Sequence, residues 1–137
     1  MDIRLYTLAD RDSCLEIFDS IPSLSGRPLF VEFLDGHLAP FFVAEHNETI
    51  VGCGGYSIQG SGARLHWGIV HSKWQRQGLG RFLLFYRLKE ITKNASVEMV
   101  ALETPRPSAL FFVSQGFREV SGNDDAVEMV KRLTVCA

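Results

Sequence analysis

Two glycines, one residue apart, separate a strand-like run from an amphipathic helix. The run ARLHWGIVH (63–71) precedes QRQGLG (75–80), and RFLLFYRLKE (81–90) comes directly after the glycines. Glycine inside a helix costs about 1 kcal/mol relative to alanine, so Gly78 and Gly80 are expected in a turn or at the start of the helix. A strand, a glycine turn and a helix in succession predict a chain in which helices pack on a sheet.

Periodic apolar residues divide the rest of the chain into further strands and helices. The expected strands are 3–8, 40–46, 49–58, 63–71, 96–104, 117–121 and 126–133. The expected helices run from Asp10 or Asp12 to Pro22, over 27–36, onward from the glycine turn, and over 107–115. This order, β-α-α-β-β-β-α-β-α-β-β, predicts a mixed α/β fold. It has a twisted, mostly antiparallel sheet of about seven strands flanked by about four helices, in one domain spanning 1–137.

Packing expectations follow from the same periodicity. The pair Asn47–Glu48, between two apolar strands, predicts a β-hairpin. Cys53 is expected to be a small residue buried in its strand, and a role as a nucleophile is less favoured. The face of the long helix expected to be buried carries Leu79, Phe82, Leu83 and Tyr86.

Charge and composition exclude several classes of function. The formal net charge is −2, so no overall basic surface indicates nucleic acid. No apolar run approaches the roughly 20 residues that a membrane helix needs, and the N-terminus lacks a secretory pattern. Cys14, Cys53 and Cys136 lack metal-ligand spacing, which indicates free thiols in the cytoplasm and no metal site.

The start of the long helix is a candidate anion site. A helix N-terminus presents unpaired backbone N–H groups and the positive end of its dipole, and glycines let the backbone approach a bound phosphate closely. The backbone amides of 77–81 are therefore expected to surround a pyrophosphate, with added charge from Arg76 or Arg81. From the glycines alone, a tight turn without any ligand is an equally good interpretation.

The segment IVHSKWQRQGLGRFLL (69–84) resembles the acetyl-CoA-binding motif of the GNAT superfamily of N-acetyltransferases. Gln75, Gly78 and Gly80 fill the motif positions. FFVAEHNETIVGCGGYSI (41–58) resembles the central hairpin of that family. ALFFVSQGFREV (109–120) resembles the helix, turn and strand that follow the fifth strand.

The resemblance implies a coenzyme site and a reaction. Acetyl-CoA is the implied co-substrate, and a primary amine of a small molecule, peptide or protein is the implied acceptor, attacking directly in a ternary complex. Pantetheine is implied to lie against the backbone around Ile69 and Val70, where an N–H group polarises the acetyl carbonyl. The implied coenzyme-binding residues are Ile69, Val70, Gln75, Arg76, Gln77, Gly78, Leu79, Gly80 and Arg81.

Proton transfer is less well defined by the sequence. His66 stands where relatives carry a general base, and imidazole suits the task, although a half-buried strand histidine is an equal alternative. Glu103 is the second candidate, with a solvated strand-end carboxylate as its plainer reading. Phe112 occupies the position where many members carry a proton-donating Tyr, so Ser108 or water is left to protonate the thiolate.

Two other functions remain open at this stage. Phe112 favours a non-catalytic acyl-CoA-binding module as the alternative, and a generic phosphate or nucleotide binder is weaker still. Residues 22–38 are implied to border the acceptor, because the corresponding segment does so in the family. A homodimer formed through an exposed sheet edge stays open.

Overall fold

The computed structural model describes residues 1–36 and 39–133, and these divide into two compact units. The first comprises Met1–Tyr56 and His66–Lys89, and the second comprises Ser57–Leu65 and the chain from Glu90 onward. The strands form one hydrogen-bonded sheet in the order β1-β2-β3-β4-β5-β7-β6. The pairs β1–β2, β2–β3, β5–β7 and β6–β7 are antiparallel, and β4–β5 is parallel, which confirms the predicted mixed sheet.

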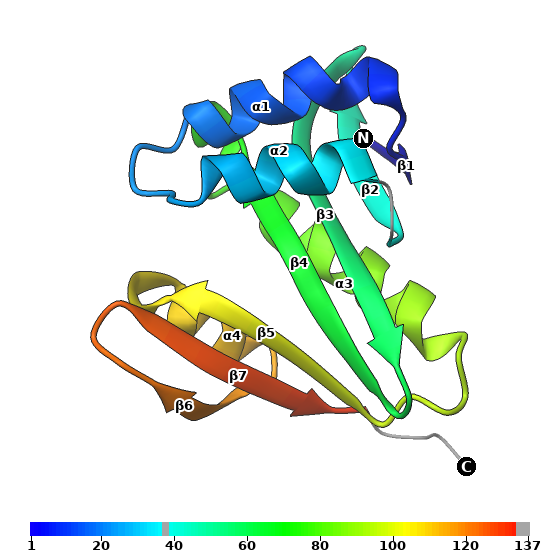
Figure 1. Cartoon of the computed structure of the whole chain (residues 1–137), viewed down its shortest axis with the longest axis vertical. Coiled ribbons are helices and arrows are strands. Elements are labelled where there is room, and N and C mark those ends of the chain that lie inside the picture. The colour runs from blue at the N-terminus through cyan, green and yellow to red at the C-terminus, as the bar shows by residue number, and fades with distance from the viewer. Residues whose placement is uncertain (37–38, 134–137) are drawn as a thin grey trace. The chain divides into compact units, whose positions relative to one another are not determined.

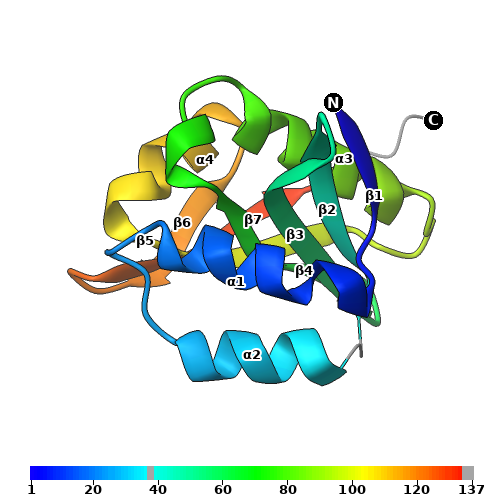
Figure 2. The same ribbon diagram turned by 90° about the horizontal axis from the view of Figure 1, so that it is seen from above.

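The first unit contains most of the N-terminal elements. Its strands are β1 (Asp2–Leu5), β2 (Phe41–His46) and most of β3 (Thr49–Gln59) and β4 (Gly62–Val70). Its helices are α1 (Arg11–Asp19), α2 (Arg27–Gly36) and most of α3 (Leu79–Thr92). Within this unit α1 and α2 lie side by side on one face of the strands and α3 covers the other (Figures 1 and 2).

Aromatic side chains fill the core between α1, α2 and the strands. Phe30 is fully buried and stacks on Phe18, with ring centroids 5.3 Å apart, and it lies 4.9 Å from the ring of Trp67. On the opposite face, Leu79 and Leu83 of α3 pack against Ala44 and Val51. Both faces of these strands are therefore covered, which explains why β2 and β3 are apolar on both alternations.

The hairpin predicted at Asn47–Glu48 is confirmed. Both residues have positive φ (50° and 65°), as the two central residues of a type I′ turn require. Ala44 pairs with Gly52 and the next residue, Glu45, pairs with Ile50, so Val51 is an extra residue and β3 carries a bulge. This bulge was not predicted, because one extra residue leaves no clear mark on the apolar alternation.

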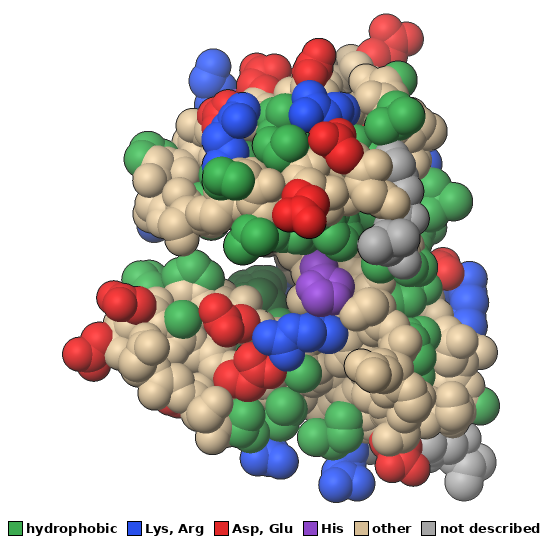
Figure 3. Space-filling model, viewed as in Figure 1, with side chains coloured by type: hydrophobic (Ala, Val, Ile, Leu, Met, Phe, Trp, Pro, Cys, Tyr) green, Lys and Arg blue, Asp and Glu red, His purple; other side chains and the backbone are tan. Residues whose placement is uncertain are grey.

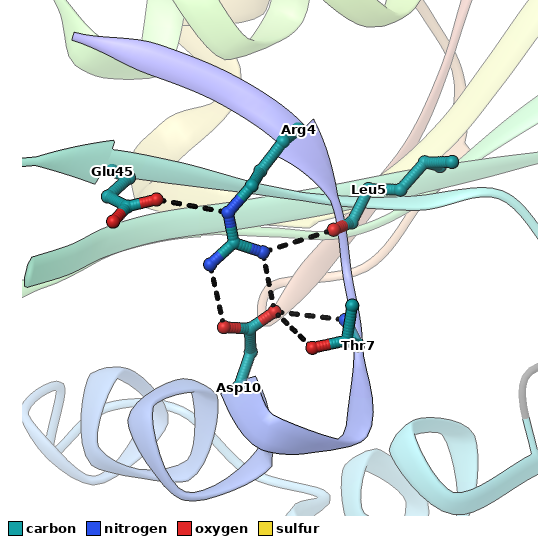
Figure 4. Close-up of polar contacts among 5 residues, drawn as sticks. All are labelled: Arg4, Leu5, Thr7, Asp10 and Glu45. Carbon is teal, nitrogen blue, oxygen red and sulfur yellow. Dashed lines mark hydrogen bonds and ion pairs between the residues drawn. The ribbon is translucent and has the colours of Figure 1, made fainter. Parts of the chain in front are cut away.

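An arginine network joins β1 to the start of α1 (Figure 4). Arg4 donates two hydrogen bonds to Asp10, at 2.8 and 2.9 Å, and one to Glu45, at 3.0 Å. Asp10 also accepts from the backbone N–H of Thr7. Asp10 thus closes the 3-10 turn Leu8–Asp10, and although it stands at the N-cap position of α1, its side chain makes no cap hydrogen bond to that helix.

The second unit is built on β5 (Met99–Pro105), β6 (Arg118–Gly122) and β7 (Ala126–Arg132). The start of β4 pairs with β5 over three residues, Gly62–Arg64 against Met99–Ala101. A 3-10 turn (Arg106–Ser108) leads into α4 (Ala109–Ser114), which contacts β6, and Gly116 follows the end of the helix with φ 94°.

One packing prediction for α3 is wrong. Leu79 and Leu83 are buried, but Phe82 is 48% exposed and Leu84 is buried instead. The helix buries positions spaced by four, one and three residues, and Phe82 falls outside that stripe. The predicted burial of Cys53 is confirmed, while Cys136 lies outside the described residues.

The surface shows mixed charge. Acidic and basic side chains are interspersed on the face drawn in Figure 3. No helix within 1–36 and 39–133 is long and apolar enough to span a membrane.

Candidate active site

The end of β4 is irregular at Trp67, which has a φ of 49° although it is neither glycine nor asparagine. Its ring lies 6.5 Å from that of Phe33 on α2, and the ring of His66 lies 6.1 Å from the same phenylalanine. Successive residues of a regular strand point to opposite faces, so the positive φ has turned both side chains toward α2. His66 is half-buried there, beside the ring of Phe33.

The loop after β4 is tied to its neighbours by hydrogen bonds. The backbone N–H of His71 donates to the carbonyl of Val51 at 2.9 Å, and that of Ser72 donates to the hydroxyl of Ser20 at 3.0 Å. The Gln75 side chain donates to the carbonyl of Val70 at 3.1 Å. The motif glutamine therefore closes the loop back onto the end of the strand, which gives Gln75 a structural role that its sequence position did not reveal.

After Gln75 the backbone leaves the regular conformations and turns into α3. Arg76 and Gly78 both have positive φ, 63° and 83°, and α3 begins at Leu79. A Cβ added at Gly78 or Gly80 would meet no heavy atom within 4 Å, so the space beside both glycines is free. The first helical hydrogen bond uses the N–H of Phe82, which donates to the carbonyl of Gly78 at 3.0 Å.

The backbone N–H groups of residues 77–81 consequently make no hydrogen bond to any described residue. Consecutive unbonded donors at the positive end of a helix are a favourable arrangement for binding an anion. Charge adds to this polarity, because the first turn of α3 holds no acidic residue. Arg76 is exposed, and Arg81 lies with its guanidinium 5.1 Å from the ring centre of Phe85.

The two other candidate residues belong to the second unit. Glu103 is exposed on β5, opposite Glu128 of β7, and both line a hollow of about 270 Å³. Arg64 donates to both carboxylate oxygens of Glu128, at 2.6 and 3.0 Å, and this contact lowers the pKa of Glu128. Ser108 is exposed at the start of α4, and its hydroxyl makes no cap hydrogen bond.

The structure thus brings Ile69, Val70, His66 and the loop 75–81 together in the first unit, whereas Glu103 and Ser108 lie in the second. Phe112 packs edge-on against Phe111 and Phe117, at 5.0 and 5.7 Å between ring centres. Burial raises the pKa of Tyr6 to about 12, which makes this phenol a poor proton donor. Residues 37–38 of the predicted acceptor segment lie outside the described residues.

Two features of the site were missed by the sequence analysis. The positive φ at Trp67 has no sequence signal, since tryptophan is an improbable residue for it. The burial of the Arg87 side chain was also missed, although glycines within two neighbouring strands, at Gly54 and Gly68, were a sequence signal that something packs closely there. Within the described part of the chain, no group of three or more His, Cys, Asp or Glu residues could hold a metal ion.

Comparison with known proteins defines the class. Residues 37–119, more than half of the chain, match the model of the acetyltransferase (GNAT) domain. The chain therefore belongs to the GNAT acetyltransferase family, and its class of enzyme is acyltransferase. No curated protein sequence matches it.

Solved structures share the fold over nearly the whole chain. The ribosomal-protein-S18-alanine N-acetyltransferase of Escherichia coli superposes with a TM-score of 0.84 at 21% identity, covering 99% of this chain and 96% of that one. The PaiA N-acetyltransferase of Thermoplasma acidophilum, solved with coenzyme A, gives 0.76 at 15%, covering 97% and 100%. An aminoglycoside 6′-N-acetyltransferase complexed with coenzyme A gives 0.81 at 17%, covering 100% and 99%. At these identities the likeness establishes the fold alone.

Proposed function

We propose that this chain, acting as one domain over 1–137, is an acetyl-CoA-dependent N-acetyltransferase that transfers acetyl to a primary amine. The observation that carries the proposal is the row of unbonded backbone N–H groups at 77–81. Coenzyme A carries a pyrophosphate, which such a row would bind through its oxygens. The coenzyme A present in two similar structures supports this choice of guest.

The proposed reaction is direct attack in a ternary complex. The neutral amine forms a C–N bond to the thioester carbon while the carbonyl electron pair moves to oxygen. Collapse restores the carbonyl and breaks the C–S bond, whose electron pair leaves with the thiolate. One proton must leave the ammonium before attack and one must leave nitrogen afterward, and the thiolate takes up a proton.

His66 is our first candidate for the base, because its side chain is half-buried beside the ring of Phe33 on α2. Glu103 is the second candidate, on the evidence that it is an exposed carboxylate lining a hollow. Ser108 or a water molecule protonates the thiolate in this scheme. A thiolate is a good leaving group, so the absence of a phenol at Phe112 slows this step little.

A non-catalytic acyl-CoA-binding module is the second candidate function. Phe112 favours it, because its ring lies among other aromatic rings and offers no proton. Both functions require the loop 75–81 to bind coenzyme, so binding alone does not separate them.

Calorimetry followed by a panel of amines separates the candidates. Acetyl-CoA should bind and should raise the melting temperature, whereas ATP at the same concentration should protect much less. The enzyme then releases free thiol when small amines, amino acids, polyamines and peptides are supplied, and a binding module does not. Absence of heat with acetyl-CoA would contradict both functions.

The proposal places the protein in the cytoplasm, where the buried thiols of Cys14 and Cys53 stay reduced. The acceptor is an amine of a small molecule, peptide or protein. The S18-alanine and aminoglycoside acceptors named for similar structures illustrate that range. Nucleic acid, membrane and metal have no part in it, and a homodimer is compatible with it.

A further inference from the structure

Arg87 of α3 is a buried arginine that makes no ion pair with the carboxylates of residues 1–36 and 39–133. Only 4% of its surface is exposed. Its Nε donates to the carbonyl of Leu83 at 3.2 Å and its Nη1 donates to the carbonyl of Gly55 at 3.4 Å.

Each of two strands, β3 and β4, places a glycine beside this guanidinium. A Cβ at Gly54 of β3 would lie 2.9 Å from Cζ of Arg87, and a Cβ at Gly68 of β4 would lie 2.7 Å from Nη2. Both positions therefore exclude any larger residue while the arginine stays in place. We call the space bounded by Gly54 and Gly68 the socket of Arg87. Glycine weakens a strand interior, so the socket destabilises two strands in addition to burying a charge.

An apolar residue would be the more stable occupant. Taking a guanidinium out of water costs several kcal/mol, and replacing buried charges by apolar residues of similar size is often neutral or stabilising. Burial lowers the pKa of Arg87 to about 10, yet the group stays charged at neutral pH. Features that break local rules in this way concentrate at functional sites.

The geometry shows where this charge can act. Nη2 lies against Gly68 and makes no hydrogen bond to any residue of 1–36 or 39–133, while the Gly68 backbone is exposed. Arg87 is eight residues into α3, roughly 12 Å along the axis from the helix start, too far to contact a phosphate bound there. The nearest functional element is therefore β4, where Gly68 directly precedes Ile69 and Val70.

This inference rests on the proposed function: we infer that the positive charge of Arg87 assists acetyl transfer without contacting the substrate. Its guanidinium, which lies against the backbone of Gly68 in β4, stabilises the negative charge that develops on the thioester oxygen. A positive charge in a water-poor site interacts far more strongly than one in water, and it needs no rearrangement during the reaction. The inference explains the missing counter-ion, because the negative charge forms on the bound thioester.

Arg87→Met tests this inference, because methionine fills the socket without charge. We expect an unchanged or higher melting temperature, unchanged affinity for acetyl-CoA, an unchanged KM for the amine, and a kcat about 10- to 100-fold lower, less than the loss of a direct oxyanion donor. Arg87→Lys should recover part of the kcat. Lys89→Met, an exposed change two residues along the same helix, is the matched control and should keep the parental kcat.

A spectroscopic measurement makes the test independent of the acceptor. The infrared stretch of carbonyl-¹³C-labelled acetyl-CoA should move to lower frequency on binding the parent, and Arg87→Met should lose that shift. A parent that binds acetyl-CoA but acetylates no amine would refute the proposed enzyme while leaving this readout in place. A parent that binds no acetyl-CoA would refute the coenzyme site itself, and the inference with it.

Other outcomes would overturn the inference alone. Arg87→Met with parental kcat and a parental carbonyl frequency would show that the charge does not reach the thioester. Joint loss of stability and coenzyme binding in Arg87→Met would show that the arginine serves packing. Unfolding of both the Met and Lys variants would assign Arg87 to the fold.

Discussion

Gly78 and Gly80 contribute differently to the loop, although only one residue separates them. Gly78 has a φ of 83°, which L side chains rarely adopt, so its role is conformational. Gly80 has no such requirement and faces open space. Its lack of a side chain matters only when a ligand fills that space.

This difference supplies a controlled mutation. Gly80→Glu puts bulk and negative charge where the pyrophosphate is proposed to bind, and we expect no measurable heat with acetyl-CoA. Gly80→Ala adds a methyl group into open space and should keep the fold, with at most a modest loss of affinity. Calorimetry on both variants, with circular dichroism for folding, checks the result. Parental affinity in Gly80→Glu would remove the loop from the coenzyme site.

His66 is the second residue whose role can be measured directly. His66→Ala should bind acetyl-CoA normally and should lower kcat by roughly 10²- to 10⁴-fold, as the loss of a general base does. The loss should be largest below the pKa of the acceptor amine, where a proton must be removed. The pH profile of kcat/KM is the deciding measurement, with Glu103→Gln run in parallel. A profile identical to the parent's would pass the role to Glu103 or to water.

At the scale of elements, the Arg4–Asp10 contact fixes β1 to the turn before α1. Hydrogen bonds from Arg4 are the main cause that lowers the pKa of Asp10, and the contact also raises the pKa of Arg4. Because the pKa of Asp10 is lower in the folded chain, the contact stabilises the fold above the unfolded value near 3.9. That stability is lost as the pH falls through the folded pKa.

Asp10→Asn should therefore lower the free energy of unfolding by about 1–2 kcal/mol at pH 7, since one partner, Arg4, is partly solvated. The variant should also lose less stability than the parent as the pH falls from 5 to 2. Urea denaturation at several pH values checks both effects. Asp124→Asn, an exposed change outside the ion pairs, serves as the control. Equal pH slopes for Asp10→Asn and parent would contradict the linkage.

The elements themselves were largely predictable from sequence, because each has a local signal. Apolar spacing located α1 and α2, and Asn47–Glu48 marked the hairpin. Irregular backbone was not predictable in the same way. The bulge in β3 and the turned backbone at Trp67 depend on tertiary packing, which no short window of sequence records.

At the scale of the whole molecule, the sequence predicted the family and the order of helices and strands along the chain correctly, and the loop 75–81 as a candidate coenzyme site. The loop was accessible because binding a pyrophosphate through backbone requires glycine at set positions. The roles of His66, Glu103 and Ser108 were not accessible to the same degree. They depend on long-range geometry around an acceptor whose identity the chain does not encode in any short motif.

The unbonded amides at 77–81 also have a practical consequence for anyone who handles the protein. If these donors bind a pyrophosphate as proposed, they should also accept other small tetrahedral anions, so we expect phosphate or sulfate from a buffer to compete for them. Coenzyme would then have to displace that ion. We therefore expect the dissociation constant of acetyl-CoA to be larger in phosphate buffer than in an organic zwitterionic buffer. Comparisons between laboratories should use the same salt.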